Sequence, residues 1–276
     1  MQKVKRALKR GFAWLIAVAV YLASVVIGYG ILSGAIWPEA TGAFVQTQGG
    51  LTIDASNAAL GYVMAKGSAG NEYKMRVTMG KAQLTYDLDS SGEYQSFPLQ
   101  LGSGKYSFEL FRHVKGSKYA QEGSISLPVE LDNEYAPFLL PNQYVDYDQN
   151  TEAVQISDEI CSDLATDEEK LAAVRDYIVS NFTYDFDKAK TIKAGVLPSI
   201  DYLFDKKMGI CQDIAATAAC MLRVQGIPTQ LVIGYANKYY HAWNNVLIDG
   251  EYQLVDLTAE INSAYQGVTY TVERYY

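Results

Sequence analysis

The sequence predicts an α+β fold in its second half, preceded by a small β-sandwich module and an N-terminal transmembrane helix. No charged residue lies between Arg10 and Glu39, which indicates the membrane segment. Short alternating runs separated by turns recur through residues 43–131, and a helix followed by a β-hairpin occupies residues 209–256. The predicted boundaries are 1–37 for the anchor, 38–132 for the β module and 133–276 for the α+β domain.

Composition narrows the possible functions. Hydrophobic residues make up 49% of the 276 positions, which supplies enough material for a core. The net charge of −8 is a poor match for nucleic-acid phosphates. Three cysteines and two histidines exclude a cysteine-dense disulfide scaffold and a metal site built from several histidines. We therefore expect no cofactor, no metal and no nucleic-acid partner.

The apolar N-terminal stretch follows a basic leader that contains Lys3, Lys5, Arg6, Lys9 and Arg10. A bilayer-spanning helix needs roughly 20 apolar residues, and this stretch is long enough. Because basic flanks stay in the cytoplasm, we expect a single-pass protein of the cell membrane with a cytoplasmic N-terminus and an extracellular remainder. One alternative is a signal peptide cleaved near Ser33-Gly34-Ala35, which gives a secreted form. Another is a core helix of a cytosolic protein.

The β module is predicted from alternating runs at Tyr73–Met79, Ala82–Leu88, Tyr106–Arg112 and Ser124–Leu131. Turn signals rich in glycine and serine separate these runs, as in a small sandwich. His113 lies in this region beside two lysines, and we interpret it as a surface residue. Residues 133–150, with Pro137 and Pro141, predict an extended connector.

A capping box opens the next region. Thr166 precedes an acidic turn, and Glu169 stands three residues later, which predicts the start of a helix. A second helix follows Gly209-Ile210-Cys211 and ends at Gly226-Ile227-Pro228. Ile214, Ala218 and Leu222 predict one buried stripe along it.

Cys211 falls at the N-terminus of that second helix. The partial positive charge and free N–H groups there favour the nucleophilic thiolate form. Cys220 lies deep in the same helix and is interpreted as a small buried hydrophobe, and Cys161 as a structural residue. A Cys161–Cys220 disulfide is the alternative for a protein outside the cell.

A hairpin presents the histidine and the aspartate. Asp249-Gly250 is a strong two-residue turn, which pairs Ile248 with Glu251. Continued along the strands, this register places His241 and Asp256 on one sheet face as diagonal neighbours. We therefore predict that Cys211 is a nucleophile, that His241 transfers its proton, and that Asp256 orients the imidazole.

Short segments of this region follow one another in a fixed order: Gly209–Ala215, Leu222–Pro228, Gly234-Tyr235, His241–Asn244 and Val255–Thr258. In this order and spacing they resemble the transglutaminase-like superfamily, and more narrowly its exported bacterial members, over roughly residues 135–260. The resemblance implies a papain-like core with the cysteine helix packed on an antiparallel sheet. It also implies a catalytic triad, which falls on Cys211, His241 and Asp256, and acyl transfer through a thioester.

The resemblance leaves two features open. Leu257 stands where many relatives carry proline, which leaves the triad intact. The backbone N–H of Cys211 is a natural donor to an oxyanion, whereas its side-chain partner is unassigned, with Tyr202 and Gln212 as candidates. Calcium, used by some animal relatives, is not expected, because no Asp-rich calcium loop appears and Asp185-Phe186-Asp187 predicts a solvated loop.

The predicted function is an outward-facing, membrane-anchored thiol enzyme that acts on protein or peptide amides. Its substrate would be a protein or peptide, such as a cell-surface or cell-wall peptide. Hydrolysis and amine transfer share the first half-reaction, so the sequence does not separate a protease or amidase from a transglutaminase. The alternative is a noncatalytic surface binding or scaffold protein with the same fold.

Overall fold

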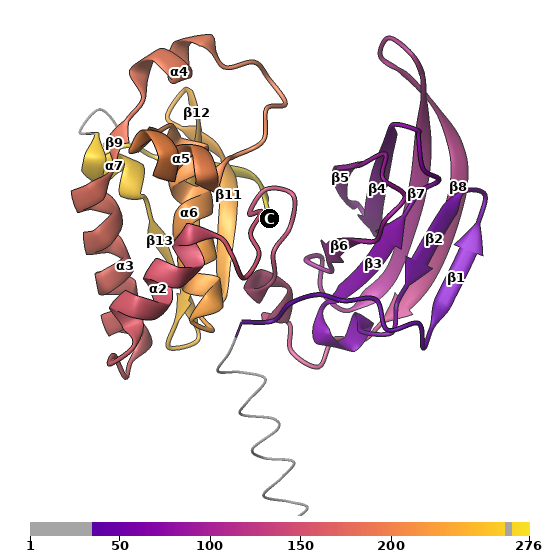
Figure 1. Cartoon of the computed structure of the whole chain (residues 1–276), viewed down its shortest axis with the longest axis horizontal. Helices are drawn as coiled ribbons and strands as arrows, with labels where there is room; N and C mark the ends of the chain where they lie inside the picture. Colours follow the sequence, from indigo (N-terminus) through magenta and orange to yellow (C-terminus); the bar gives the residue numbers. More distant parts are fainter. Residues whose placement is uncertain (1–34, 263–266) are drawn as a thin grey trace, which may run out of the picture.

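The computed structural model describes residues 35–262 and 267–276. Most of the predicted anchor at residues 1–37 lies outside this part. Within the described residues, no helix combines the length and the apolar character needed to cross a membrane. Figure 1 shows a β module (β1 to β8) beside a domain in which helices cover a separate sheet.

The β module consists of two four-stranded antiparallel sheets, which confirms the predicted β structure. Burial alternates along β4, as expected for a strand with one face in the core. The first sheet has the order β1 (Val45–Gln48), β2 (Leu51–Asp54), β3 (Tyr62–Lys66), β6 (Gln95–Pro98), and η1 (Ala58–Leu60) lies between β2 and β3. The second has the order β5 (Ala82–Leu88), β4 (Tyr73–Met79), β7 (Gly104–Lys115), β8 (Lys118–Val129).

The connector differs from the extended segment predicted for residues 133–150. It contains a short 3-10 helix, η2 (Ala136–Leu139), whose residues are all buried, and a bridge between Asn142 and Val145. Aromatic and apolar residues explain the difference, since an extended exposed chain would leave them in water. The connector is therefore part of the core.

The second domain surrounds one central helix, α6 (Cys211–Val224), which packs against the sheet and against other helices. The predicted capping box is confirmed at α3, where Thr166 and Glu169 each accept a backbone N–H of the other. The remaining helices are α2 (Glu152–Cys161), α3 (Asp167–Asn181), α4 (Phe186–Thr191), α5 (Ile200–Lys206) and α7 (Leu257–Ile261).

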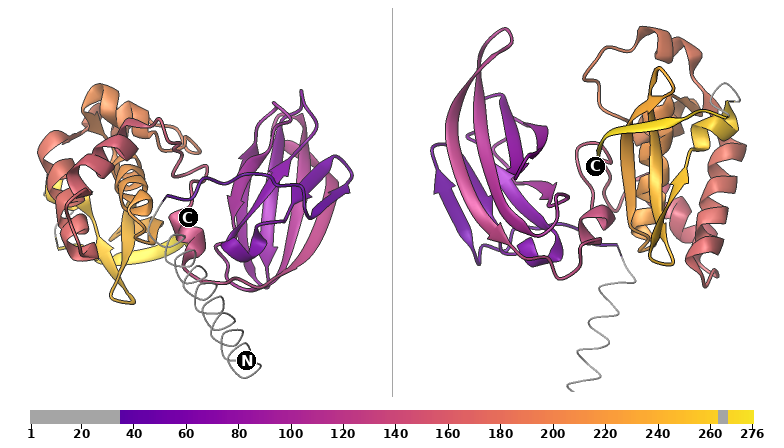
Figure 2. Two further views of the ribbon diagram at one scale, coloured as in Figure 1. Left: turned by 60° about the horizontal axis from the view of Figure 1, so that its bottom comes forward. Right: turned by 180° about the vertical axis from the view of Figure 1, so that it is seen from behind.

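A four-stranded antiparallel sheet supports α6, as the sequence predicts. Its order is β13 (Glu251–Val255), β12 (Tyr239–Ile248), β11 (Thr229–Ala236), β14 (Tyr270–Tyr275). β9 (Thr183–Tyr184) and β10 (Met208–Gly209) form a small parallel pair that leads into α6. Figure 2 shows the sheet edge-on with α6 against one face.

Burial along α6 is wider than the predicted stripe. Every residue from Asp213 to Val224 is buried, because the helix contacts β11 and β12 on one side and α2, α3 and α5 elsewhere. Alanines at 215, 216, 218 and 219 let these neighbours approach closely. A helix that is apolar all round is typical of a central position, and this signal was available in the sequence.

Arg223 lies at the end of α6 and is fully buried. Its guanidinium donates to the carbonyl oxygens of Leu140 (2.6 Å), Thr229 (2.7 Å) and Tyr276 (2.9 Å). It therefore joins the connector, β11 and the segment after β14. Burial lowers the pKa of Arg223, because the charged form loses hydration.

Aromatic rings join the two halves of the molecule. The Tyr276 ring stacks on Tyr144 of the connector at 3.6 Å and lies 6.0 Å from Tyr86 of β5. Tyr86 also donates to Gln100 at 2.8 Å, which satisfies its buried hydroxyl. The buried apolar cluster runs through both regions without a break.

Candidate active site

Cys211 is the first residue of α6 and is partly exposed. Its position places the sulfur at the positive end of a helix whose remaining turns are buried. Glycine at position 209 lets the chain before Cys211 pass close to Leu203 and Asp213. A Cβ at Gly209 would lie 2.7 Å from Leu203 Cδ1 and 3.0 Å from Asp213 Cβ. The sequence prediction that Cys211 begins a helix is confirmed.

Asp213 fixes the turn that carries the cysteine. This carboxylate is 0% exposed and accepts the backbone N–H of Ile210 at 3.0 Å. It also accepts from Ser199 N at 3.0 Å and from the Lys188 ammonium at 2.7 Å. These bonds tie α4, α5 and α6 together. The sequence analysis missed this role, although an acidic residue at the third position of a helix is a capping signal.

His241 and Asp256 contact each other directly. His241 Nε2 lies 2.8 Å from Asp256 Oδ2, and both side chains are almost completely buried. His241 comes from β12, and Trp243 on the same strand stacks beside it at 6.2 Å between ring centroids. Asp256 holds the imidazole in one orientation, as the sequence predicts for this pair.

Asp256 reaches His241 from a helix cap and not from the strand position that the sequence predicts. Ile248 pairs with Glu251 as expected, but the ladder ends at Asn244 and Val255. Asp256 is instead the N-cap of α7 and accepts the backbone N–H of Ala259 at 3.0 Å. Helix capping thus competes with strand extension at this aspartate, and its second carboxylate oxygen still reaches His241.

The Cys211 thiol is also among the groups that favour the charged form of His241, so the three predicted residues lie close together. Burial opposes the charged imidazolium, but the interactions with Asp256 and Cys211 outweigh it and raise the pKa of His241 to about 9. Protonated imidazole at neutral pH is the partner that a cysteine thiolate needs.

The chain is similar to a known protein family and to several solved structures. Residues 154–257 match the family model described as the Transglutaminase-like superfamily. This part of the chain is therefore a transglutaminase-like domain. No curated protein matches the chain.

Solved structures similar to the chain have low sequence identity. A candidate cysteine protease from Cytophaga hutchinsonii is 17% identical with a TM-score of 0.42, over 76% of this chain and 83% of that one. A transglutaminase from red sea bream is 13% identical with a TM-score of 0.32, over 75% of this chain and 49% of that one. A structure described as a TGase is 20% identical with a TM-score of 0.35, over 53% and 44%.

The transglutaminase-like domain holds its aspartate with a further residue that sequence reasoning missed. Tyr270 of β14 donates its hydroxyl to Asp256 Oδ2 at 2.7 Å and packs its ring 5.0 Å from Trp243. Burial and this hydrogen bond raise the pKa of Tyr270, so it stays a neutral donor. No local motif marks it, because the contact depends on β14 pairing with β11.

The two candidate side-chain donors to an oxyanion are engaged elsewhere in the domain. Tyr202 donates to Asp185 at 2.7 Å, and Gln212 Nε2 donates to the Val196 carbonyl at 3.1 Å. The predicted solvated loop at Asp185-Phe186-Asp187 is wrong. Asp185 is buried and caps α4, where it accepts the N–H groups of residues 187 and 188.

The other candidate residues lie away from the triad. Cys161 and Cys220 are buried free thiols, so the alternative disulfide is absent. Burial raises the pKa of both thiols, which suits the predicted structural role. His113 lies in the β module, where its Nε2 contacts the Gly116 carbonyl at 2.8 Å. Among the described residues, no three His, Cys, Asp or Glu side chains converge to hold a metal ion.

Proposed function

We propose that the protein is a thiol enzyme that transfers acyl groups from protein or peptide amides through a Cys211 thioester. The observation that carries this proposal is the buried 2.8 Å contact between His241 and Asp256, with the Cys211 sulfur at a helix N-terminus where it favours the charged form of His241. The match to the transglutaminase-like superfamily supports it.

In the first half-reaction, the thiolate sulfur of Cys211 attacks the amide carbonyl carbon and forms a C–S bond. The carbonyl oxygen becomes an oxyanion, to which the backbone N–H of Cys211 is a suitable donor. The C–N bond then breaks, and the imidazolium of His241 gives its proton to the departing amine. Asp256 keeps the imidazole aligned and stabilises its charged form throughout.

In the second half-reaction, water or a primary amine attacks the thioester carbonyl. His241, now neutral, takes the proton of the attacking group, and the C–S bond breaks to restore the thiolate. Water gives an acid, as in a protease or amidase, and an amine gives a new amide, as in a transglutaminase.

Mass spectrometry tests the proposal and separates the outcomes. Peptide substrates are incubated with the protein, with and without an added primary amine. A cut peptide indicates a protease, conversion of a glutamine amide to an acid indicates an amidase, and a gain of amine mass indicates transfer. All three changes should disappear in Cys211→Ala. Turnover that persists in this variant would contradict the proposal.

Labelling with iodoacetamide separates the enzyme from a noncatalytic scaffold. Cys161 and Cys220 are buried, so the folded protein should be alkylated at Cys211 alone. We expect fast labelling that slows in His241→Asn, because the imidazolium stabilises the thiolate. Labelling at the rate of an ordinary thiol, unchanged in the variant, would favour the scaffold.

We also propose that residues 1–37 anchor the protein in the cell membrane with residues 38–276 outside it. The uncharged stretch after a basic leader supports this. Substrates would then be surface proteins or wall peptides close to the membrane. Pelleting with membranes after an alkaline carbonate wash is expected. Release into the soluble fraction would exclude the anchor, and loss of the leader from the mature chain would indicate a cleaved signal.

A further inference from the structure

The helix that begins at Cys211 has a carboxylate buried in its first turn. Asp213 is 0% exposed and folds back onto the backbone N–H of Ile210 at 3.0 Å. Its negative charge therefore lies at the same helix end as the Cys211 sulfur. Because like charges repel strongly where water is excluded, this carboxylate opposes the thiolate on which acyl transfer depends.

Lys188 of α4 supplies the opposite charge. Its ammonium lies 2.7 Å from Asp213 Oδ2, the oxygen that also accepts from Ile210. The lysine side chain is 17% exposed, so salt and solvent screen this pair less than a surface pair. Lys190 on the same helix gives the contrast, since its side chain is 74% exposed and its partner Asp187 is 97% exposed. Lys188 is therefore directed at the start of α6, whereas Lys190 is a surface lysine.

An aromatic ring and a second carboxylate hold Lys188 in position. The ammonium lies 3.7 Å from the centroid of the Tyr202 ring of α5. The Tyr202 hydroxyl donates to Asp185 at 2.7 Å, and Asp185 accepts the N–H groups of residues 187 and 188. The hydrogen bond to Asp185 raises the pKa of Tyr202, so the ring stays neutral and attracts the cation. A closed ring of contacts thus fixes the ammonium beside Asp213.

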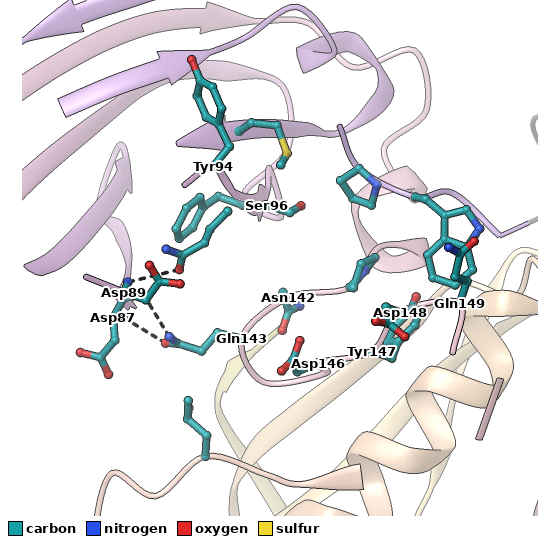
Figure 3. Close-up of a pocket in the computed structure, with 17 residues that line it drawn as sticks. Asp87, Asp89, Tyr94, Ser96, Asn142, Gln143, Asp146, Tyr147, Asp148 and Gln149 are labelled. Atoms are coloured by element: carbon teal, nitrogen blue, oxygen red, sulfur yellow. Dashed lines mark hydrogen bonds between the residues drawn. The ribbon is translucent and has the colours of Figure 1, made fainter. Parts of the chain in front are cut away.

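The loop between α4 and α5 contacts the same turn of α6. Ser199 N donates to Asp213 Oδ1 at 3.0 Å, and the Val196 carbonyl accepts from Gln212 at 3.1 Å. On its other side the loop carries Leu197, which lines a cavity of about 670 Å³ (Figure 3). Among the described residues, neither a lysine, an arginine nor a triad residue lines this cavity, so it offers Asp213 no further counter-charge.

Capping alone does not require these charges. A neutral asparagine at position 213 would keep an acceptor for the start of α6. A buried ion pair also carries a desolvation cost that often exceeds its attraction, so stability does not explain it. The charged groups around the nucleophile come from α4, α6, β12 and α7, and the cations Lys188 and His241 stand against Asp213, Asp256 and the sulfur of Cys211.

We propose that Lys188 is a positioning residue for acyl transfer, which balances the charge of Asp213 and thereby favours the thiolate of Cys211. Lys188 acts through Asp213, whose carboxylate lies between the ammonium and the backbone that precedes the nucleophile. The inference rests on the proposed function, because it concerns the nucleophile of that reaction. It adds to the triad a cation from α4, a helix that carries no triad residue.

Alkylation of the full-length protein in a neutral detergent tests the proposal without any substrate. Iodoacetamide reacts with the thiolate, and mass spectrometry follows the peptide that contains Cys211. Lys188→Gln keeps a hydrogen-bond donor near Asp213 and removes the charge, so the rate at about pH 6.5 should fall at least threefold. At about pH 10, where an ordinary thiol is ionised, parent and variant should react at similar rates. A merely structural role would change the rate at both pH values.

Companion variants make the result specific. Asp213→Asn added to Lys188→Gln removes the charge that the lysine balances, so the rate at about pH 6.5 should return to within about twofold of the parent. Lys188→Met should repeat the fall seen in Lys188→Gln, and Lys190→Met is the matched control that should react as the parent does. Labelling of the buried Cys161 or Cys220 would reveal a variant that has lost its fold.

Two results would overturn the proposal. One is an equal rate at about pH 6.5 in the parent and in both single variants of Lys188. The other is a fall in the double variant as large as in Lys188→Gln, because the lysine would then act independently of Asp213. Peptide turnover is a separate measurement, so a parent that turns over no peptide would contradict the proposed function and leave the alkylation comparison decisive for Lys188.

Discussion

Each of the two histidines of this chain lies beside a carboxylate, but the two histidine–carboxylate pairs differ in burial and in distance. His113 in the β module and His241 in the transglutaminase-like domain each face a carboxylate. The Glu72 side chain beside His113 is 77% exposed and 3.4 Å away, whereas the Asp256 side chain is 4% exposed and 2.8 Å from His241. Solvent weakens the first pair, and burial strengthens the second. Residue type alone therefore does not make a catalytic pair.

The largest expected difference is in turnover, between a variant of His241 and a variant of His113. His241→Asn should lower peptide turnover by about 10³-fold or more, because the proton acceptor and donor is lost. His113→Asn should leave turnover within about twofold. The measurement is the initial rate by mass spectrometry, with folding checked by circular dichroism. Equal losses in the two variants would mean that His241 acts only through the fold.

Two arginines extend the comparison to stability. Arg223→Met removes the guanidinium that donates to three carbonyl oxygens and should lower the free energy of unfolding by about 3–5 kcal/mol. Arg112→Met removes an exposed ion pair with Glu122 (3.3 Å) and should cost about 0.5 kcal/mol or less. Urea unfolding of both variants checks this. A small loss of unfolding free energy in Arg223→Met would mean that water replaces the guanidinium as donor to these carbonyl oxygens.

The pH dependence of stability should report on His241. An unfolded histidine titrates near pH 6.5, whereas folding raises the pKa of His241 to about 9. Protonation therefore favours the folded state. The stabilisation is complete below about pH 6.5 and is lost as the pH rises through 9, by up to about 3 kcal/mol. The difference in unfolding free energy between the parent and His241→Asn, measured from pH 6 to 10, isolates this contribution. A difference that grows with pH would refute it.

The smallest expected effect on turnover comes from replacing a tyrosine beside each histidine by phenylalanine. Tyr270→Phe removes the second donor to Asp256 Oδ2 and should lower turnover by about tenfold, with the melting temperature almost unchanged. Tyr119, whose ring lies 5.2 Å from His113, is the control, and Tyr119→Phe should have no effect on turnover. Unaltered turnover in Tyr270→Phe would leave Asp256 positioned by His241 and α7 alone.

Local patterns predicted much of this molecule. The Asp249-Gly250 turn gave the hairpin register, Thr166 and Glu169 gave the start of α3, and Gly226-Ile227-Pro228 gave the end of α6. Each of these signals lies within a few residues of the feature it predicts. Turn geometry and capping are determined by neighbours in the chain, so they can be recognised without the fold.

The remaining features depend on contacts between distant segments. Tyr270 reaches Asp256 only because β14 pairs with β11, and Arg223 is buried only because the connector and Tyr276 close around it. Side-chain burial and partners of this kind follow from tertiary packing, which a single-sequence pattern does not record.

The position of β14 has a consequence for synthesis on the ribosome. Tyr270 and Tyr276 follow Cys211, His241 and Asp256 in the chain, yet they supply Asp256 and Arg223 with partners. The nascent chain therefore completes its nucleophile, base and central helix well before the residues that hold them together emerge. Reactivity at Cys211 should therefore reach its full level only after β14 has been translated and has paired with β11.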